Sequence, residues 1–145
     1  MHDRHFGHWL AGFIAGEGCF RIHKEKRGAY YACHFSLKVR ADDGDILRDI
    51  HRRVGFGTLK MDVSARTNPC LAWVVQSRKD CFALMHLLDL FPLRAKKASE
   101  YQIWREALVF WSQMKRGNRW HGPRDWAGMI AFYERMKEVH AYHRA

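Results

Sequence analysis

The sequence predicts an α+β domain built on one antiparallel sheet, in the order helix, two strands, helix, two strands and then further helices. Three observations support this fold class. A helical period at the N-terminus gives way at Cys19 to an alternation of period two. A cleaner alternation follows over residues 31–40, and apolar residues return to helical spacing after Ser77. The 145 residues favour a single domain over 1–145, with a core at about 4–115 and a helical extension at about 116–145.

The first helix is predicted at Leu10 to Gly18, which reads LAGFIAGEG. Its apolar residues recur at helical spacing, while Gly12 and Gly16 form a stripe of small residues on another side. Glu17 falls at the C-terminal end of this helix, and Gly18 is a typical helix stop.

The alternation assigns faces to the next two strands, which are joined by a turn at Gly28. From Tyr31 to Val39 the odd-numbered residues are apolar, and the even-numbered ones after Ala32 are polar with an excess of positive charge. The first strand alternates in the same way. The polar positions are Arg21, His23, Glu25 and Arg27 on the first strand and His34, Ser36, Lys38 and Arg40 on the second.

The remaining elements follow from caps, stops and periodicity. Asp42 or Asp43 is predicted to cap a short helix that ends at Gly55. Two strands are predicted at 56–63 and 70–77, and the exposed face of the second of them stays undecided because both sets of its residues are apolar. The next predicted helix is capped by Ser77, has Asp80 in its first turn and ends at Pro92. Another helix is predicted from about Ala98 to Lys115. The last is amphipathic, and its apolar side holds Trp126, Met129, Ile130, Tyr133 and Met136.

The charge balance predicts an anionic partner. The chain has 25 Lys and Arg against 15 Asp and Glu, a formal net charge of +10. It has no window of 18 uninterrupted apolar residues and no long apolar signal core, so we expect no membrane span and a soluble, intracellular protein. The four cysteines and ten histidines lack the spacings of common zinc sites, so we expect buried free thiols and no structural metal.

The glycine stripe and Glu17 together predict a paired site. Glycines four residues apart let two such helices approach backbone to backbone, so Gly12 and Gly16, with the neighbouring Trp9, are the predicted dimer interface. Two-fold symmetry would bring two Glu17 carboxylates together, which is costly unless a cation such as Mg²⁺ lies between them. A solvated glutamate before a turn is the simpler alternative, but a carboxylate at the negative end of a helix is unfavourable.

The segment LAGFIAGEG resembles the motif of the LAGLIDADG homing endonuclease family. It departs from that motif at Ala15, where the family often has an acidic residue. The resemblance covers roughly residues 8–111 and implies the family's αββαββα fold, with a saddle-shaped antiparallel sheet and, here, extra C-terminal helices. The residues that carry it are Leu10, Ala11, Gly12, Ile14, Gly16, Glu17 and Gly18, then Val54-Gly55-Phe56-Gly57 and Pro92-Leu93-Arg94-Ala95-Lys96-Lys97.

The resemblance also implies a site-specific, divalent-metal-dependent DNA endonuclease. In the family the acidic residue of the motif binds the catalytic metal with help from the preceding carbonyl, which here means Glu17 and the carbonyl of Gly16. The metal would be Mg²⁺ or Mn²⁺, and a water bound to it would attack the phosphodiester. For the assisting basic residue, Lys96 matches best and Lys97 is the fallback. A single motif copy implies a homodimer that cuts a long pseudo-palindromic site across the minor groove, leaving short 3′ overhangs, as enzymes encoded in mobile introns do.

Double-stranded DNA is expected on the polar face of the sheet, because a β-ribbon fits the major groove and the twist of the sheet makes a saddle. The alternative is an ordinary sheet face exposed to solvent. The excess of positive charge on this face, and an order of helices that leaves one sheet face uncovered, favour DNA binding. The basic loop with Arg116, Arg119 and Arg124 is a second candidate for phosphate contacts. The predicted DNA-binding residues are Arg21, His23, Glu25, Arg27, His34, Ser36, Lys38, Arg40, Thr58, Lys60 and Asp62.

Other functions fit the same residues. The fold could serve as an RNA-splicing maturase that binds intron RNA, or as a transcription regulator that does not cleave. A monomeric RNA-binding protein with a basic sheet, such as a ribosome-associated factor, is a further alternative. Glu17 and Lys96 favour cleavage of DNA, and the protein would then work in the cytoplasm or in an organelle matrix, wherever its target DNA lies.

Overall fold

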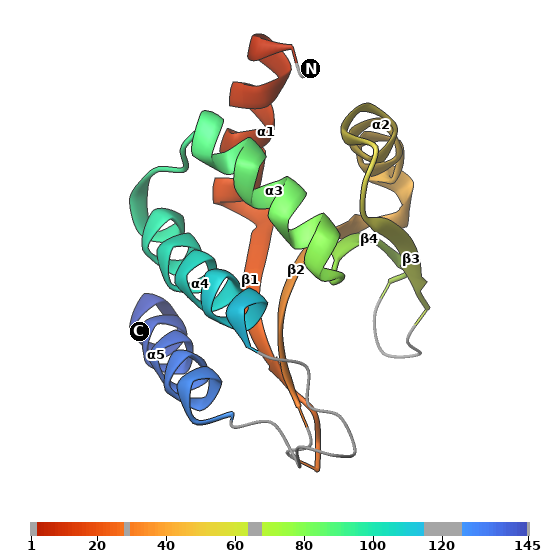
Figure 1. The fold of residues 1–145 in the computed structure, drawn as a ribbon. Coiled ribbons are helices and arrows are strands. Elements are labelled where there is room, and N and C mark those ends of the chain that lie inside the picture. The colour runs from red at the N-terminus through yellow and green to blue at the C-terminus, as the bar shows by residue number, and fades with distance from the viewer. Residues whose placement is uncertain (1–2, 28–29, 64–67, 115–125, 145) are drawn as a thin grey trace.

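Four antiparallel strands form one sheet in the order β1-β2-β4-β3, and helices pack against one of its faces (Figure 1). The computed structural model describes residues 3–27, 30–63, 68–114 and 126–144. The predicted α+β fold and order of elements are confirmed. The elements are α1 (Arg4–Glu17), β1 (Gly18–Lys24), β2 (Tyr31–Arg40), a short 3-10 helix η1 (Ala41–Asp43), α2 (Asp45–Val54), β3 (Thr58–Asp62), β4 (Cys70–Val75), α3 (Arg78–Leu90), α4 (Ala95–Gln113) and α5 (Ala127–Arg144).

The register of the sheet separates a helix-covered face from an open face. Phe20 lies opposite Phe35 on the covered face, and Arg21 lies opposite His34 on the other. Residues directly opposite each other in an antiparallel pair point to the same side, so the predicted alternation of the first two strands is confirmed. The strand direction turns progressively from β1 to β3, as the right-handed twist of a sheet requires (Figure 1).

The register also decides the face of β4. Val74 pairs with Ser36 and Ala72 pairs with Lys38, which places these two small apolar residues on the open face. The larger Trp73 pairs with Leu37 and is fully buried under the helices. The sequence of β4 could not show which of its sides faces the open side of the sheet, because both sides are apolar. Only the pairing of β4 with the polar residues of β2 distinguishes the two sides.

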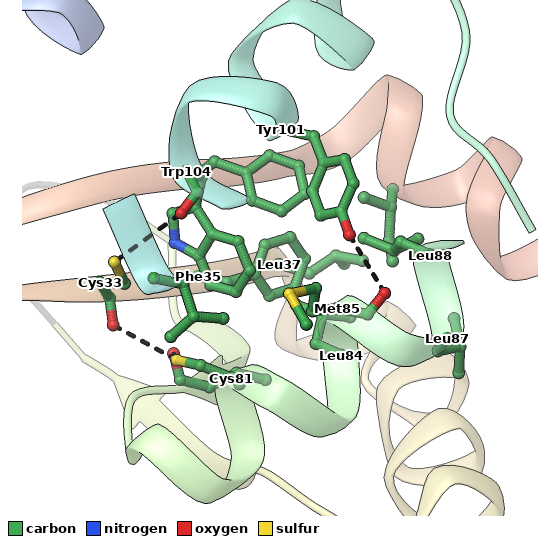
Figure 2. Close-up of a cluster of buried hydrophobic side chains, with 14 of the residues drawn as sticks. Cys33, Phe35, Leu37, Cys81, Leu84, Met85, Leu87, Leu88, Tyr101 and Trp104 are labelled. Carbon is green, nitrogen blue, oxygen red and sulfur yellow. Dashed lines mark hydrogen bonds between the residues drawn. The ribbon is translucent and has the colours of Figure 1, made fainter. Parts of the chain in front are cut away.

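The core lies between the sheet and helices α3 and α4 (Figure 2). The Trp104 indole is fully buried and donates from Nε1 to the carbonyl of His34, 2.9 Å away. Cys33 and Cys81 are buried free thiols, as predicted, and burial raises the pKa of Cys81 to about 12. Cys19, in contrast, is exposed, because it lies on the open face of β1. The expectation of buried thiols is therefore wrong for Cys19.

Several boundaries differ from the prediction. Helix α1 starts at Arg4, because the Asp3 side chain accepts from the backbone N–H of His5 and caps the first turn. Neither Asp42 nor Asp43 caps α2: both lie in η1, and the N-cap is Gly44. Gly55 does end α2, with a left-handed φ of 78°.

Strand β1 is shorter than predicted and ends at Lys24. Glu25 and Arg27 therefore lie beyond the strand, where the Glu25 carboxylate accepts from the backbone N–H of Arg27. The Ser77 side chain caps α3 as predicted. The backbone N–H of Asp80 donates to the Ser77 hydroxyl, and the Asp80 carboxylate accepts from the backbone N–H of Gly57.

Helix α5 packs beside α4 and against β1, at that edge of the sheet (Figure 1). Met129 and Met136 are buried there, whereas Ile130, predicted on the apolar side, is 42% exposed. The predicted basic loop at 116–124 lies outside the described residues, as does the turn at Gly28. Among the helices that the structure describes, none combines the length and hydropathy needed to cross a bilayer.

Candidate active site at the end of the first helix

Helix α1 has one buried and one exposed face. Leu10 and Ile14 are fully buried against the core. On the other side Trp9 is 44% exposed, and Gly12 and Gly16 are also exposed. A Cβ atom added at Gly12 or Gly16 would meet no heavy atom within 4 Å among the described residues. The two glycines are therefore not required by packing inside this chain.

A third glycine of the same helix behaves differently. A Cβ atom at Gly7 would collide with the ring of Phe91, which lies between α3 and α4. Gly7 thus lets α1 approach the rest of the domain closely. Packing explains Gly7 but leaves the exposed pair, Gly12 and Gly16, without a role in the monomer.

Glu17 is exposed and is the last residue of α1. Gly18 follows in extended conformation and is the first residue of β1, so the chain passes from helix to strand without a loop. A Cβ atom at Gly18 would come within 2.8 Å of the Ile14 carbonyl, which explains the glycine. The motif therefore presents a carboxylate at the junction of α1 and the sheet.

Lys97 brings a positive charge to this junction. Its Nζ donates to the carbonyl of Gly18 at 2.6 Å, and its side chain is only 18% exposed. Lys96, the preferred candidate from the sequence, lies one residue earlier in the first turn of α4 and is exposed. The structure thus brings the fallback residue, Lys97, to the end of the motif helix.

Lys97 also belongs to a buried polar cluster that sequence reasoning missed. Glu100 is 6% exposed and lies 3.9 Å from Lys97. Its two carboxylate oxygens each lie 2.9 Å from a ring nitrogen of α5, one on His140 and one on His143. Lys97 and Glu100 are three residues apart, as are His140 and His143, so each pair lies on one helix face. This spacing is the sequence signal that could have suggested the polar cluster.

The donors at the junction fit a hard divalent cation. Glu17 offers a carboxylate, and the carbonyl of Gly16 lies in the last turn of α1, where carbonyls have no partner within the helix. Oxygen donors of this kind are those that Mg²⁺ prefers. The described residues of one chain contain no cluster of three or more His, Cys, Asp or Glu side chains able to hold a metal.

The open face of the sheet carries most of the predicted DNA-binding side chains. Two of its cations are already partnered: Lys38 lies 3.2 Å from Asp62, and Arg40 lies 3.4 Å from Asp42. The small side chain of Ala72, between β2 and β3, leaves room for the contact from Lys38 to Asp62. The predicted residues on this face are Arg21, His23, His34, Ser36, Lys38, Arg40, Thr58, Lys60 and Asp62.

Two histidines stack on this face, one on the edge strand β1 and one on β2. The rings of His23 and His34 lie 4.6 Å apart with 9° between their planes. Burial, together with the nearby charges of His23, Arg21 and Lys60, lowers the pKa of His34 to about 4. Its Nδ1 is buried, and among the described residues it has no hydrogen-bond partner. His34 is therefore neutral at physiological pH.

Comparison with known proteins identifies relatives of this chain. It is 31% identical over 107 residues to the probable intron-encoded endonuclease Cox1-I1b of Schizosaccharomyces pombe, covering 72% of this chain and 27% of that protein. The structure superposes on the LAGLIDADG homing endonuclease I-LtrWI bound to target DNA with a TM-score of 0.73, at 21% identity, over 88% of this chain and 43% of that one. It also resembles the homing endonuclease I-TnaI, with a TM-score of 0.66 at 18% identity, over 98% of this chain and 99% of that one.

The chain thus spans about a quarter of the length of the curated relative from S. pombe. The model of the LAGLIDADG endonuclease family matches residues 10–108, a segment that begins within α1, contains the whole sheet and ends within α4, the helix that carries Lys97. On this match, the chain belongs to the LAGLIDADG endonuclease family.

Proposed function

We propose that this protein is a site-specific double-stranded DNA endonuclease that acts as a homodimer. The observation that carries the proposal is the hydrogen bond from Lys97 to Gly18, which brings a cation to the end of α1, where Glu17 lies. Family membership and fold similarity to an endonuclease bound to target DNA support the same reaction class. The basic open face next to this junction supports DNA as the substrate.

The exposed glycine face of α1 supports the homodimer. Gly12 and Gly16 leave space that nothing in the described chain fills, and Trp9 adds a large exposed apolar side chain beside them. Two α1 helices packed through this face about a two-fold axis would place their C-terminal ends together. Each protomer would then contribute one Glu17 to a paired site.

The residues at the junction would divide the chemistry between them. Glu17 and the carbonyl of Gly16 would hold a divalent cation, Mg²⁺ or Mn²⁺. Such a cation supplies charge stabilisation at the phosphate and acidifies an attacking water. Lys97 has three N–H donors and gives one to Gly18, so another can reach a phosphate oxygen and neutralise charge that develops there. Lys96 is the alternative for this role, since it is exposed one residue away.

The open face would hold the duplex next to the paired site. Arg21 and Lys60 can contact phosphates or guanine edges, and Ser36 and Thr58 can contact either kind of group. The two sheets of a dimer would read two half-sites related by the same axis, which predicts a pseudo-palindromic target. As expected from the family resemblance, cleavage would cross the minor groove and leave short 3′ overhangs.

Selection of cleaved molecules from a randomised duplex library in Mg²⁺ tests the proposal and identifies the target. We expect enrichment of one long pseudo-palindromic site. Glu17→Gln should then bind this site with unchanged affinity and fail to cut it. Replacing Mg²⁺ with Ca²⁺ should also allow binding without cleavage. Cleavage by Glu17→Gln at the normal rate would refute the metal assignment.

A different result would favour a different function. If the wild-type protein binds duplex DNA tightly but cuts no library member in Mg²⁺ or Mn²⁺, it is a binding protein of this fold, such as a regulator. Preferential binding to intron RNA would instead indicate a maturase. A protein that sediments as a monomer at micromolar concentration and shows no preference for duplex DNA would contradict both the dimer and the nuclease.

A further inference from the structure

A basic groove runs between the edge strand β1 and the C-terminal helix α5. Its volume is about 520 Å³. Its lining includes the buried side chains of Ile22 of β1 and Met136 of α5, together with Tyr133 and Ala141 of α5. The polar residues that line it are Arg21, His23 and Lys24 of β1 and Lys137, His140 and Arg144 of α5.

The charges of this groove are all of one sign. Arg21, Lys24, Lys137 and Arg144 line it, and no Asp or Glu does. Within the described parts of the chain, none of the four takes part in an ion pair, unlike Lys38 and Arg40 on the open face. Four like charges around one groove repel each other, and a bound anion would relieve that repulsion. The lining of the groove therefore fits an anionic ligand.

The groove is continuous with the open face of the sheet. Arg21 and His23 point to the open face, since they pair with His34 and Ala32, and the same two residues line the groove. Lys24 lies on the side of α5, with its Nζ 5.6 Å from the centre of the Tyr133 ring. The cationic side chains thus extend from the open face, through Arg21 and Lys24 of β1, to Lys137 and Arg144 of α5.

We propose that this groove binds backbone phosphates of the DNA that flanks the segment held on the open face. This inference rests on the proposed function, because the duplex on the sheet brings its own flank to the groove. The continuity through Arg21 and His23 favours the same polyanion over a small free anion. Contacts between cationic side chains and phosphates carry no base information, so these contacts would be independent of sequence.

The test compares two charge-matched double variants. Lys137→Ala with Arg144→Ala removes two cations from the groove. Arg52→Ala with Lys79→Ala removes two exposed cations from α2 and α3, away from the groove. The probe is a labelled duplex of arbitrary sequence, since phosphate contacts do not require the target site. Its dissociation constant is measured by fluorescence anisotropy in Ca²⁺ over a series of salt concentrations, for the full chain and both double variants.

The groove variant should bind roughly tenfold more weakly, and the slope of log K against log salt should fall by about 1.8, since each phosphate that is no longer neutralised lowers it by about 0.9. The Arg52/Lys79 control should keep most of the slope. Shortening the selected target site at its flanks should weaken binding by the wild type and leave binding by the groove variant unaffected.

Other results would overturn the inference. Equal slopes for the two double variants would show that the groove cations act only through net charge. A loss confined to single-stranded RNA, with duplex binding unchanged, would assign the groove to RNA instead. Failure of the groove is distinguishable from failure of the nuclease, because the wild type would still bind and cut the selected site.

Discussion

Lys97 in the first turn of α4 donates a 2.6 Å hydrogen bond to the carbonyl of Gly18 in β1. This contact joins residues 79 positions apart and ties α4 to the residue that follows Glu17. An ammonium group also offsets the negative end of the α1 dipole, where the Glu17 carboxylate is otherwise unfavourable. The contact therefore has both a structural and an electrostatic role at the proposed site.

Lys97→Met should abolish most cleavage while Lys96→Met should not. Removing the cation beside the phosphate is expected to slow cleavage by roughly a hundredfold or more. Single-turnover cleavage of the selected site with saturating protein measures this rate. Lys97→Arg keeps the charge and should recover part of it. The assignment to Lys97 fails if Lys96→Met loses activity and Lys97→Met keeps it.

Glu100→Ala should destabilise the domain more than Glu106→Ala, although both carboxylates link α4 to α5. Glu100 is 6% exposed and contacts Lys97, His140 and His143, so its loss should cost roughly 2–4 kcal/mol. Glu106 pairs with Arg135 at 3.1 Å on the surface, where such pairs contribute about 1 kcal/mol or less. Urea unfolding measures both free energies, and equal losses would contradict a central role for Glu100.

These contacts also show where sequence reasoning ends. The motif helix, the alternation of β2 and the stop at Gly55 are local signals, and each was predicted. The face of β4 depends on pairing with β2, so its own apolar residues could not reveal it. The choice between Lys96 and Lys97 depends on a rotation of about 100° around α4. The three-residue spacings place Lys97 with Glu100 and His140 with His143 on helix faces, but the cluster also requires α5 to fold back onto α4, which no local pattern contains.

Gly12→Ala should stabilise the isolated protomer and weaken the proposed dimer. The added Cβ atom meets nothing within 4 Å, and alanine is better than glycine inside a helix by about 1 kcal/mol. In the dimer the same methyl group would separate the two helices. Sedimentation equilibrium measures the association, and thermal unfolding measures the stability.

Gly7→Ala is the matched control for that substitution. It lies on the same helix, but its Cβ atom would strike the Phe91 ring, so we expect a loss of roughly 1–3 kcal/mol in protomer stability. Dimerisation of the folded fraction should persist. Unchanged dimerisation of Gly12→Ala, or of the bulkier Gly12→Leu, would show that the exposed glycine face is not the interface.

Acidification should destabilise the folded domain through His34. Its pKa is about 4 in the folded state against an ordinary value of 6.5, so below pH 6.5 the unfolded chain binds a proton that the folded chain does not. Stability should therefore be complete above pH 6.5 and fall between pH 6.5 and 4, with no further loss from this group below that range. Since one pKa unit corresponds to about 1.4 kcal/mol, the full shift corresponds to about 3.5 kcal/mol, and because His34 is only half-buried, solvent screening reduces the expected loss to roughly 1–3 kcal/mol. Urea unfolding at a series of pH values measures this loss of stability.

His34→Gln should remove the pH-dependent loss, whereas His86→Gln, at an exposed position on α3, should leave it in place. An identical pH dependence in wild type and His34→Gln would show that His34 titrates normally.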